Sequence, residues 1–213
     1  MAEPKTARGR QRKGAIISAA AALMYEHGVK ATSVDDVLVA SGCGKSQFYH
    51  YFSGKDDLVA DVLELQLETV LGGVDEFRLD TWSGIRAWFD SLLAGQEQRG
   101  FRGCPVGALA IELSGSSASM QRHVAQAFSR WETSLADAFV SMKKKELLEP
   151  SAQPALLAEA MLTAIQGGYL LSTARRELRP LQTALAAAYT QLRASRARAA
   201  SSESCAPSSA PRD

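Results

Sequence analysis

The chain has 213 residues, of which 46% are apolar and 22% charged, values that are normal for a soluble globular protein. Its formal net charge is only +1, so a nucleic-acid surface has to come from local clustering of basic residues. The sequence has no run of about 18 apolar residues and opens on a polar, basic stretch, so neither a membrane span nor a secretory signal is expected. Three scattered cysteines are too few for a disulfide framework or a zinc site, which favours a cytoplasmic location with a reducing environment.

The first 13 residues carry five basic side chains against one acidic side chain. Residues 1–10 cannot contribute to a core, and we expect a disordered basic arm there. Such an arm is either a solubilising tail or a segment that follows nucleic-acid phosphates or a minor groove. Arg12 and Lys13 open the first expected helix, at about 11–27, in which Ile16, Ala20 and Met24 recur at helical spacing.

Two short helices separated by a glycine-rich turn follow that first helix. Ser33-x-x-Asp36 resembles a capping box, so a second helix is expected to begin near Ser33 or Val34. The stretch Ser41-Gly42-Cys43-Gly44 ends it, and Phe48 and Phe52 then share one face of a third helix. An apolar anchor beneath a row of polar side chains predicts a helix-turn-helix within a DNA-binding domain at 11–55.

The remainder of the chain, 56–199, is rich in alanine and leucine and lacks the alternation of a strand. A fourth helix is expected from after Phe52 to about residue 71, where Gly72-Gly73 predicts a break. Five further helices are expected at about 81–98, 105–113, 117–147, 154–178 and 181–199. The predicted fold is all-α with about nine helices, and residues 200–213 are expected to be a disordered, low-complexity tail.

The segment GKSQFYHYFSGKDDLVADVL resembles the recognition-helix signature of TetR-family transcriptional regulators. The matching positions are Gly44, Phe48, Tyr49, Phe52, Lys55 and Asp57, and the resemblance covers about residues 10–65. GCPVGALAIEL, beginning at Gly103, is similar to the GCxxG-containing branch of the family. The resemblance implies a repressor that binds a palindromic operator in double-stranded DNA as a homodimer through about 154–199. It also implies a C-terminal pocket for a small-molecule effector that releases the DNA.

The exposed side of the third helix supplies the candidate DNA contacts. Gln47 has the groups to bond adenine bidentately, and Lys45 those to bond guanine or a phosphate. Tyr49 and His50 are more suited to phosphates, and Ser46 to either partner. The other candidates are hydroxyls at a helix N-terminus and flanking basic residues: Thr32, Ser33, Lys55, Arg12 and Lys13. The competing interpretation is a solvated helix face.

Aromatic side chains of the C-terminal region are either core packing or the lining of the implied pocket. The candidates are Trp88, Phe89, Phe101, Phe128, Trp131 and Tyr169, with polar groups from Glu112, His123 and Gln166. This composition favours a hydrophobic or aromatic ligand. Cys104 precedes an expected helix start and has Arg102 nearby, two features that favour a thiolate.

Three alternatives remain open. Cys104 is either a sensor of oxidants or electrophiles or a small buried residue, and the whole chain is alternatively a helical ligand-binding protein without DNA binding. An enzyme is the weakest interpretation, because only three histidines occur and no nucleophile–base, metal-ligand or phosphate-loop spacing is found. No catalytic residue, metal or cofactor is therefore predicted.

Overall fold

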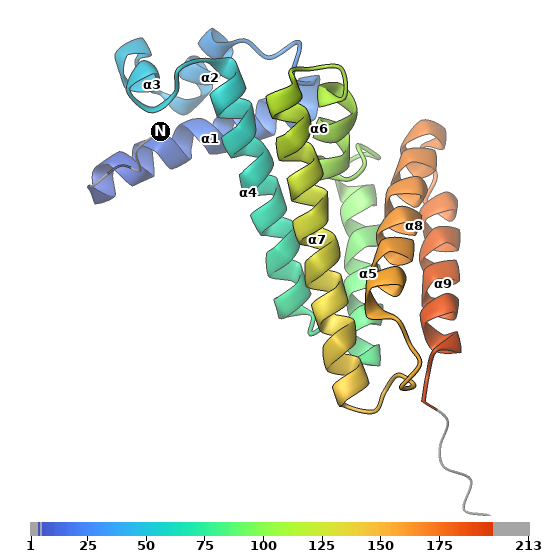
Figure 1. Ribbon diagram of the computed structural model, residues 1–213. Helices are drawn as coiled ribbons and strands as arrows, with labels where there is room; N and C mark the ends of the chain where they lie inside the picture. The colour runs from blue at the N-terminus through green and yellow to red at the C-terminus, as the bar shows by residue number, and fades with distance from the viewer. Residues whose placement is uncertain (1–3, 5, 198–213) are drawn as a thin grey trace, which may run out of the picture.

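The computed structural model describes Pro4 and residues 6–197, and within these residues the chain forms nine helices and no strand. The helices are α1 (Ala7–His27), α2 (Val34–Ser41), α3 (Lys45–Tyr51), α4 (Lys55–Glu76), α5 (Trp82–Gln98), α6 (Pro105–Leu113), α7 (Ala118–Lys144), α8 (Pro154–Arg175) and α9 (Arg179–Ala194). Figure 1 shows α1–α3 at one end and the long helices running away from them. The predicted all-α fold, with an N-terminal helix-turn-helix and a C-terminal helical domain, is confirmed.

Local capping decides where α2 begins and ends. The Ser33 hydroxyl accepts the backbone N–H of Asp36 at 3.1 Å, and the Asp36 carboxylate accepts the N–H of Ser33 at 2.8 Å. This is the expected capping box, and its hydrogen bonds lower the pKa of the Asp36 carboxyl. The helix ends at Gly42, whose φ of 65° lies in the left-handed region that glycine adopts without strain.

Two phenylalanines on the inner side of α3 hold that helix to the rest of the domain. Phe48 and Phe52 are 0% and 1% exposed, and their ring centroids lie 5.2 Å apart. They belong to the same buried cluster as Ile16 of α1, Val37 of α2 and Leu58 of α4. Because these aromatic rings occupy the inner side, the polar residues of α3 face away from the domain.

Two helix ends differ from the sequence expectation for identifiable reasons. Helix α1 begins at Ala7 because Thr6 caps it by accepting the N–H of Gly9 at 3.1 Å, so residues 7–10 are helical rather than part of a disordered arm. Helix α4 continues through Gly72-Gly73 to Glu76, since tertiary packing that buries Val74 outweighs the low helix propensity of two glycines. The expected tail at 200–213 lies outside the described residues.

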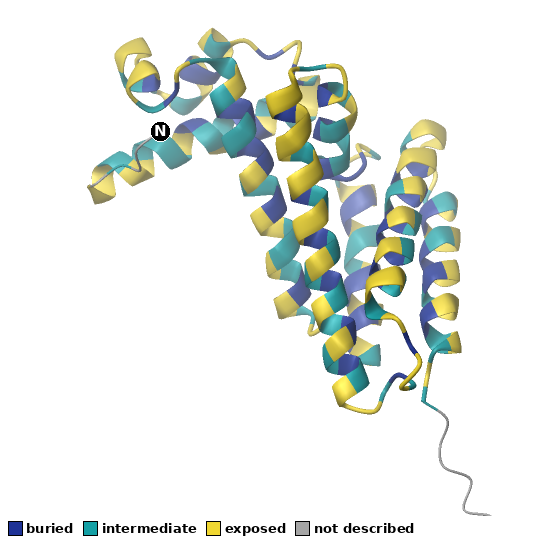
Figure 2. Ribbon diagram, in the orientation of Figure 1, coloured by how far each residue is buried: buried dark blue, intermediate teal, exposed yellow. Residues whose placement is uncertain are grey.

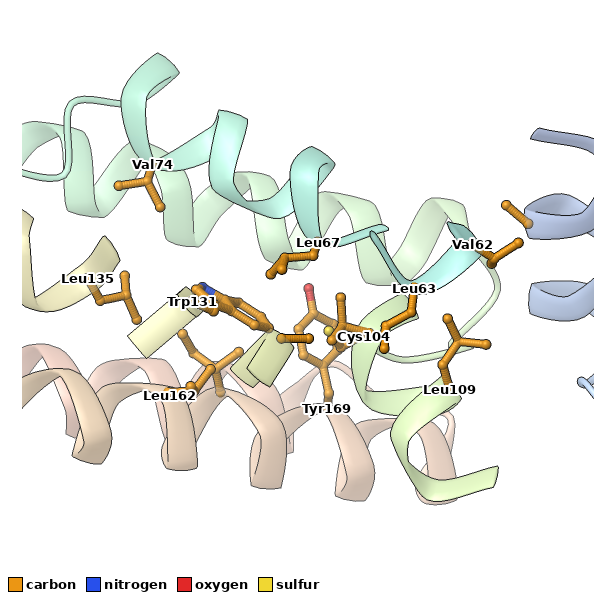
Figure 3. Close-up of a cluster of buried hydrophobic side chains, with 14 of the residues drawn as sticks. Val62, Leu63, Leu67, Val74, Cys104, Leu109, Trp131, Leu135, Leu162 and Tyr169 are labelled. Atoms are coloured by element: carbon orange, nitrogen blue, oxygen red, sulfur yellow. The ribbon is translucent and has the colours of Figure 1, made fainter. Parts of the chain in front are cut away.

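The C-terminal domain is a bundle in which α8 packs against α7 and α9, and α4 packs against α7. Figure 3 shows one part of its core, where Trp131 and Leu162 lie near Tyr169 and Cys104 below α4. The chain after α9 also pairs with the α7–α8 connection, because the N–H of Glu149 donates to the carbonyl of Ser195 at 2.9 Å. This contact keeps the lower ends of α7 and α9 together.

Helix α8 has an unusually apolar composition for a helix that is only partly buried. By length and composition alone it could cross a membrane, and it is the one such helix in the described part of the chain. Its buried side packs within the bundle, whereas Leu156, Leu170 and Leu171 are 56%, 56% and 47% exposed. Figure 2 shows these alternating buried and exposed positions along α8. An apolar side therefore remains uncovered in the single chain.

Substitution of Phe48 by alanine should lower the free energy of unfolding by about 3–5 kcal/mol, because a fully buried aromatic side chain is lost. Chemical denaturation followed by far-UV circular dichroism measures this change. The neighbouring Tyr49→Ala is the matched control, since Tyr49 is 58% exposed and should change stability by less than about 1 kcal/mol. Equal losses in the two variants would contradict the inward orientation of Phe48.

Candidate DNA-binding surface and effector cavity

Helix α3 presents the predicted row of polar side chains on one exposed surface. Lys45, Ser46, Tyr49 and His50 are exposed and Gln47 is half-buried, while Phe48 points into the domain. A helix of this size with its polar side outward fits the major groove of B-DNA. The geometry therefore suits DNA contact by these five residues, and each individual contact stays a prediction.

Two of these side chains have partners inside the free protein. The Lys45 amine lies 3.2 Å from the Asp35 carboxylate, and both side chains are more than 60% exposed. The Gln47 side-chain oxygen accepts the backbone N–H of Gly44 at 3.4 Å, which caps the start of α3. A bidentate bond from Gln47 to adenine would use the same oxygen, which has two lone pairs and so can accept a second hydrogen bond.

Thr32 and Lys13 have partners within the protein. Thr32 is 2% exposed, and its hydroxyl donates to the carbonyl of Gly28 at 2.9 Å, so that hydroxyl is not presented to a phosphate. The Lys13 amine lies 2.7 Å from the Asp61 carboxylate of α4 and 5.7 Å from the centre of the Phe52 ring. This ion pair joins α1 to α4, and a DNA contact by Lys13 stays a prediction, as it does for the ion-paired Lys45.

The remaining flanking candidates keep an accessible position. Arg12 in α1 and Lys55 at the first position of α4 are half-buried, and Ser33 is exposed at the start of α2. The Ser33 hydroxyl is already engaged with Asp36, so its backbone and the start of α2 are the groups that remain for a phosphate. These three residues stay candidates for contacts beside the major groove.

The C-terminal domain contains two hollows that share Cys104 and Tyr169 in their linings. The first, which we call the inner cavity, has a volume of about 230 Å³ and lies between α4, α5, α7 and α8. The second, the outer groove, has a volume of about 800 Å³ and lies between α6, α7 and α8. Of the predicted ligand residues, Trp88 and Trp131 line the inner cavity, and Phe128 and Gln166 line the outer groove.

Four predicted ligand residues lie elsewhere. Phe89 is buried with its ring 6.4 Å from that of Tyr189, where it packs α5 against α9. Phe101 belongs to the connection between α5 and α6 and has a left-handed φ of 61°. His123 is exposed on α7, beside a separate hollow of about 80 Å³. The fourth residue, Glu112, contacts the DNA-binding domain.

Cys104 does not have the environment of an activated thiol. It caps α6 as predicted, but it is only 4% exposed, and burial raises the pKa of its thiol. The backbone N–H groups of Val106 and Gly107 act in the opposite direction and do not overcome that burial. The expectation of a stabilised thiolate is therefore corrected, because a buried apolar setting favours the neutral thiol.

Hydrogen bonds join the DNA-binding domain to α6 and to the segment just before it, part of which lines the outer groove. The Tyr25 hydroxyl of α1 donates to the carbonyl of Gly103 at 2.8 Å, and Arg102 donates to the carbonyl of Glu26 at 2.7 Å. The Glu112 carboxylate accepts the backbone N–H of Val29 at 2.7 Å, just beyond the end of α1. We call these three contacts the interdomain hydrogen bonds.

Arg99 is a residue of the inner cavity that the sequence interpretation missed. It follows directly after α5, and its guanidinium Nε is buried without a hydrogen-bond partner. In the sequence it stands in the polar run QEQRG, which reads as an exposed helix end. Only the packing of α4, α7 and α8 around this point makes it part of a cavity.

The described residues contain no group of three or more histidine, cysteine or acidic side chains placed to hold a metal ion. The arrangement defines a helix-turn-helix DNA-binding protein with a second, helical domain. Residues 16–62 match the family described as "Bacterial regulatory proteins, tetR family". Residues 82–187 match "Transcriptional regulator LmrA/YxaF-like, C-terminal domain".

Related proteins agree with both matches. The chain is 30% identical over 181 residues to an uncharacterized HTH-type transcriptional regulator in the lacX 3' region of Lactococcus lactis subsp. lactis, with 82% of this chain and 89% of that protein covered. It is 22% identical over 175 residues to the HTH-type transcriptional repressor DhaR of a Mycobacterium species, with coverages of 80% and 86%. The chain therefore belongs to the tetR family of bacterial transcriptional regulators and is a regulator rather than an enzyme.

A solved structure shows the same fold. The regulatory protein TetR from Rhodobacter sphaeroides superposes with a TM-score of 0.73 at 24% sequence identity, covering 83% of this chain and 96% of that one. The likeness extends over the helix-turn-helix and the helical bundle together. The resemblance inferred from the recognition-helix signature is confirmed by the family match over residues 16–62.

Substitution of Asp35 by asparagine should strengthen DNA binding roughly two- to fivefold, because it removes a negative charge beside Lys45 and frees the lysine amine for phosphate. Fluorescence anisotropy with labelled DNA at a fixed salt concentration measures the change. Asp137→Asn is the matched control, since Asp137 is an exposed acidic residue of α7 and should leave the affinity unchanged. Weaker binding by Asp35→Asn would contradict this role of the ion pair.

Proposed function

We propose that this protein is a cytoplasmic repressor that binds a palindromic operator as a homodimer and leaves the DNA when a small molecule enters the C-terminal domain. One observation carries the proposal: Arg102 and Gly103 line the outer groove, directly precede Cys104 in the lining of both hollows, and make two of the interdomain hydrogen bonds. Membership of the tetR family supports DNA binding. The inner cavity and the outer groove support a ligand.

The proposed dimer forms through residues 154–199. The support is the uncovered apolar side of α8, where Leu156, Leu170 and Leu171 would otherwise remain in water. A two-fold axis at this interface places two copies of α3 on the same DNA. Half-sites about 34–36 Å apart, one turn of B-DNA, are what such a pair of helices reads.

The proposed signal passes through α6. A ligand in the inner cavity or the outer groove contacts Cys104, which lines both hollows and follows Gly103, and so displaces the segment that holds Tyr25, Glu26 and Val29. Because these residues lie at the end of α1 and just beyond it, their displacement rotates the helix-turn-helix and changes the distance between the two copies of α3. Couplings of this kind are typically about 1–3 kcal/mol, which is enough to move a repressor between bound and free DNA states.

The two alternatives are less well supported. A redox or electrophile sensor at Cys104 needs a reactive thiolate, and the burial that raises the thiol pKa opposes its formation. A ligand-binding protein without DNA binding would not need the exposed polar side of α3. The matches to transcriptional regulators over most of the chain also speak against that alternative.

The apolar side of α8 provides a test of the dimer. Leu171→Glu should convert the protein to a monomer and weaken binding to a two-half-site operator at least about tenfold, because it places a charge in the apolar contact. Light scattering after size exclusion measures the mass. Val140→Glu on α7 is the control, since Val140 is also partly exposed but lies on another helix. A monomeric wild type would overturn the proposed dimer.

The DNA-binding role is tested with the DNA immediately upstream of the protein's own gene, searched for a palindrome and used in gel-shift assays. Gln47→Ala should change the base preference, whereas Lys55→Ala should weaken all sequences alike and reduce the salt slope by about one. Wild-type protein that binds this DNA no better than random DNA at the same salt concentration would count against operator binding there. Equal losses on operator and random DNA in both variants would overturn the division of roles.

A further inference from the structure

The guanidinium of Arg99 occupies an unusual place for a charged group. It lies against the last turn of α5, where a Cβ atom on Gly95 would come within 2.6 Å of Nη1. Any larger residue at position 95 would have to displace the guanidinium from this place. The Nε atom is buried and has no hydrogen-bond partner. A buried donor of this kind, on a cation, normally has a partner in a folded protein.

The surroundings of Arg99 contain only weak acceptors. No carboxylate lies within ion-pair distance of it among the described residues. Burial raises the pKa of Tyr25 and Tyr169, and the Arg99 guanidinium opposes that rise in both, so the two phenols are its near neighbours. The Tyr25 hydroxyl donates to the carbonyl of Gly103, and the Tyr169 hydroxyl donates to the carbonyl of Leu92. The guanidinium therefore has only the oxygens of two neutral phenols as acceptors.

A second buried donor lines the same cavity. The indole N–H of Trp131 is buried and has no partner, and Figure 3 shows this ring near Tyr169 and Cys104. Much of the remaining lining is apolar, with Trp88 and Leu92 from α5 among its members. Glu76, the acidic residue of the lining, is exposed at the end of α4. The inner cavity thus combines apolar walls with one cation, the Arg99 guanidinium, whose partners there are the two neutral phenols and whose Nε has none.

We propose that the inner cavity binds a small monocarboxylic acid with an aromatic or short acyl body, and that Arg99 binds its carboxylate. This inference rests on the proposed function and names its ligand class. A planar guanidinium binds a carboxylate bidentately, and the Trp88 and Trp131 rings in the lining supply apolar surface for the body of the acid. A dianionic phosphate is a poorer fit, because within the described chain the lining contains a single basic residue. The volume of about 230 Å³ limits the acid to a small one.

The site adjoins the contact that α1 makes with the C-terminal domain. Tyr25 is near Arg99 and donates to Gly103, one of the interdomain hydrogen bonds. A carboxylate on Arg99 draws the guanidinium away from the two phenols, and the Tyr25 hydroxyl responds because it belongs to the same cluster. The acid therefore acts at the point where the DNA-binding domain is held.

The test uses the full-length protein and three acids, each paired with its neutral amide: benzoate, phenylacetate and hexanoate. Isothermal titration measures affinity, and tryptophan fluorescence reports occupancy because Trp88 and Trp131 line the cavity. At least one acid should bind tenfold or more tightly than its amide. Amides that bind as tightly as all three acids, or a panel in which no acid binds, would overturn the proposal.

Variants locate the charge that causes this preference. Arg99→Gln should reduce the acid-to-amide affinity ratio to about one, whereas Arg99→Lys should retain part of it because the positive charge remains. Arg86→Gln is the control, since Arg86 is an exposed arginine of α5 that bonds Tyr189 outside the cavity. An unchanged ratio in a folded Arg99→Gln protein would overturn the role of Arg99. If Arg99→Gln does not fold, the Arg99→Lys variant decides instead. An acid-to-amide affinity ratio of about one in Arg99→Lys would then overturn the role of Arg99.

Failure of this inference is distinguishable from failure of the proposed function. Gel shifts with the wild-type protein and its upstream DNA, without any acid, test DNA binding alone. If the protein binds its operator but does not bind acids more tightly than amides, only the carboxylate site is overturned. If it binds acids more tightly than amides but does not bind the operator, only the repressor function is overturned.

Discussion

The interdomain hydrogen bonds are the constraint on which the rest of this structure depends. Tyr25, Glu26 and the N–H of Val29 are all held by groups that belong to α6 or to the segment just before it. The Glu112 and Arg102 contacts, both 2.7 Å long, are stronger than the neutral Tyr25 hydrogen bond, because a hydrogen bond with one charged partner is stronger than one between neutral groups. Cys104, which follows Gly103, lines both the inner cavity and the outer groove, so the proposed ligand sites adjoin these contacts with the end of α1.

The DNA-facing side of α3 is stabilised internally before any DNA is bound. Lys45 has Asp35 as its partner, and Gln47 caps its own helix through Gly44. A phosphate contact by Lys45 would therefore compete with the Asp35 ion pair, so its net gain would be smaller than that of an unpaired lysine. Affinity that comes from such phosphate contacts depends on the salt concentration.

The position of several functional side chains was predictable because short-range patterns decide it. The Ser33–Asp36 capping box and the glycine turn before α3 are encoded within a few residues, and the spacing of Phe48 and Phe52 sets the side of α3 that faces outward. Residues with long-range partners were not predictable. Nothing near Lys13 in the chain indicates its ion pair with Asp61 of α4, and Glu112 was expected in a ligand pocket, whereas α6 places it at the end of α1.

By itself the sequence determined the all-α class, the helix-turn-helix and the tetR family, because helical periodicity, caps and a contiguous signature are local properties. Only the tertiary structure decided that α4 runs on through two glycines and that Cys104 is buried with a raised thiol pKa. It also decided that Arg99 faces a cavity without an acidic partner. These outcomes depend on the environment that distant helices create, because the burial of a group and the charges around it come from residues far apart in the chain.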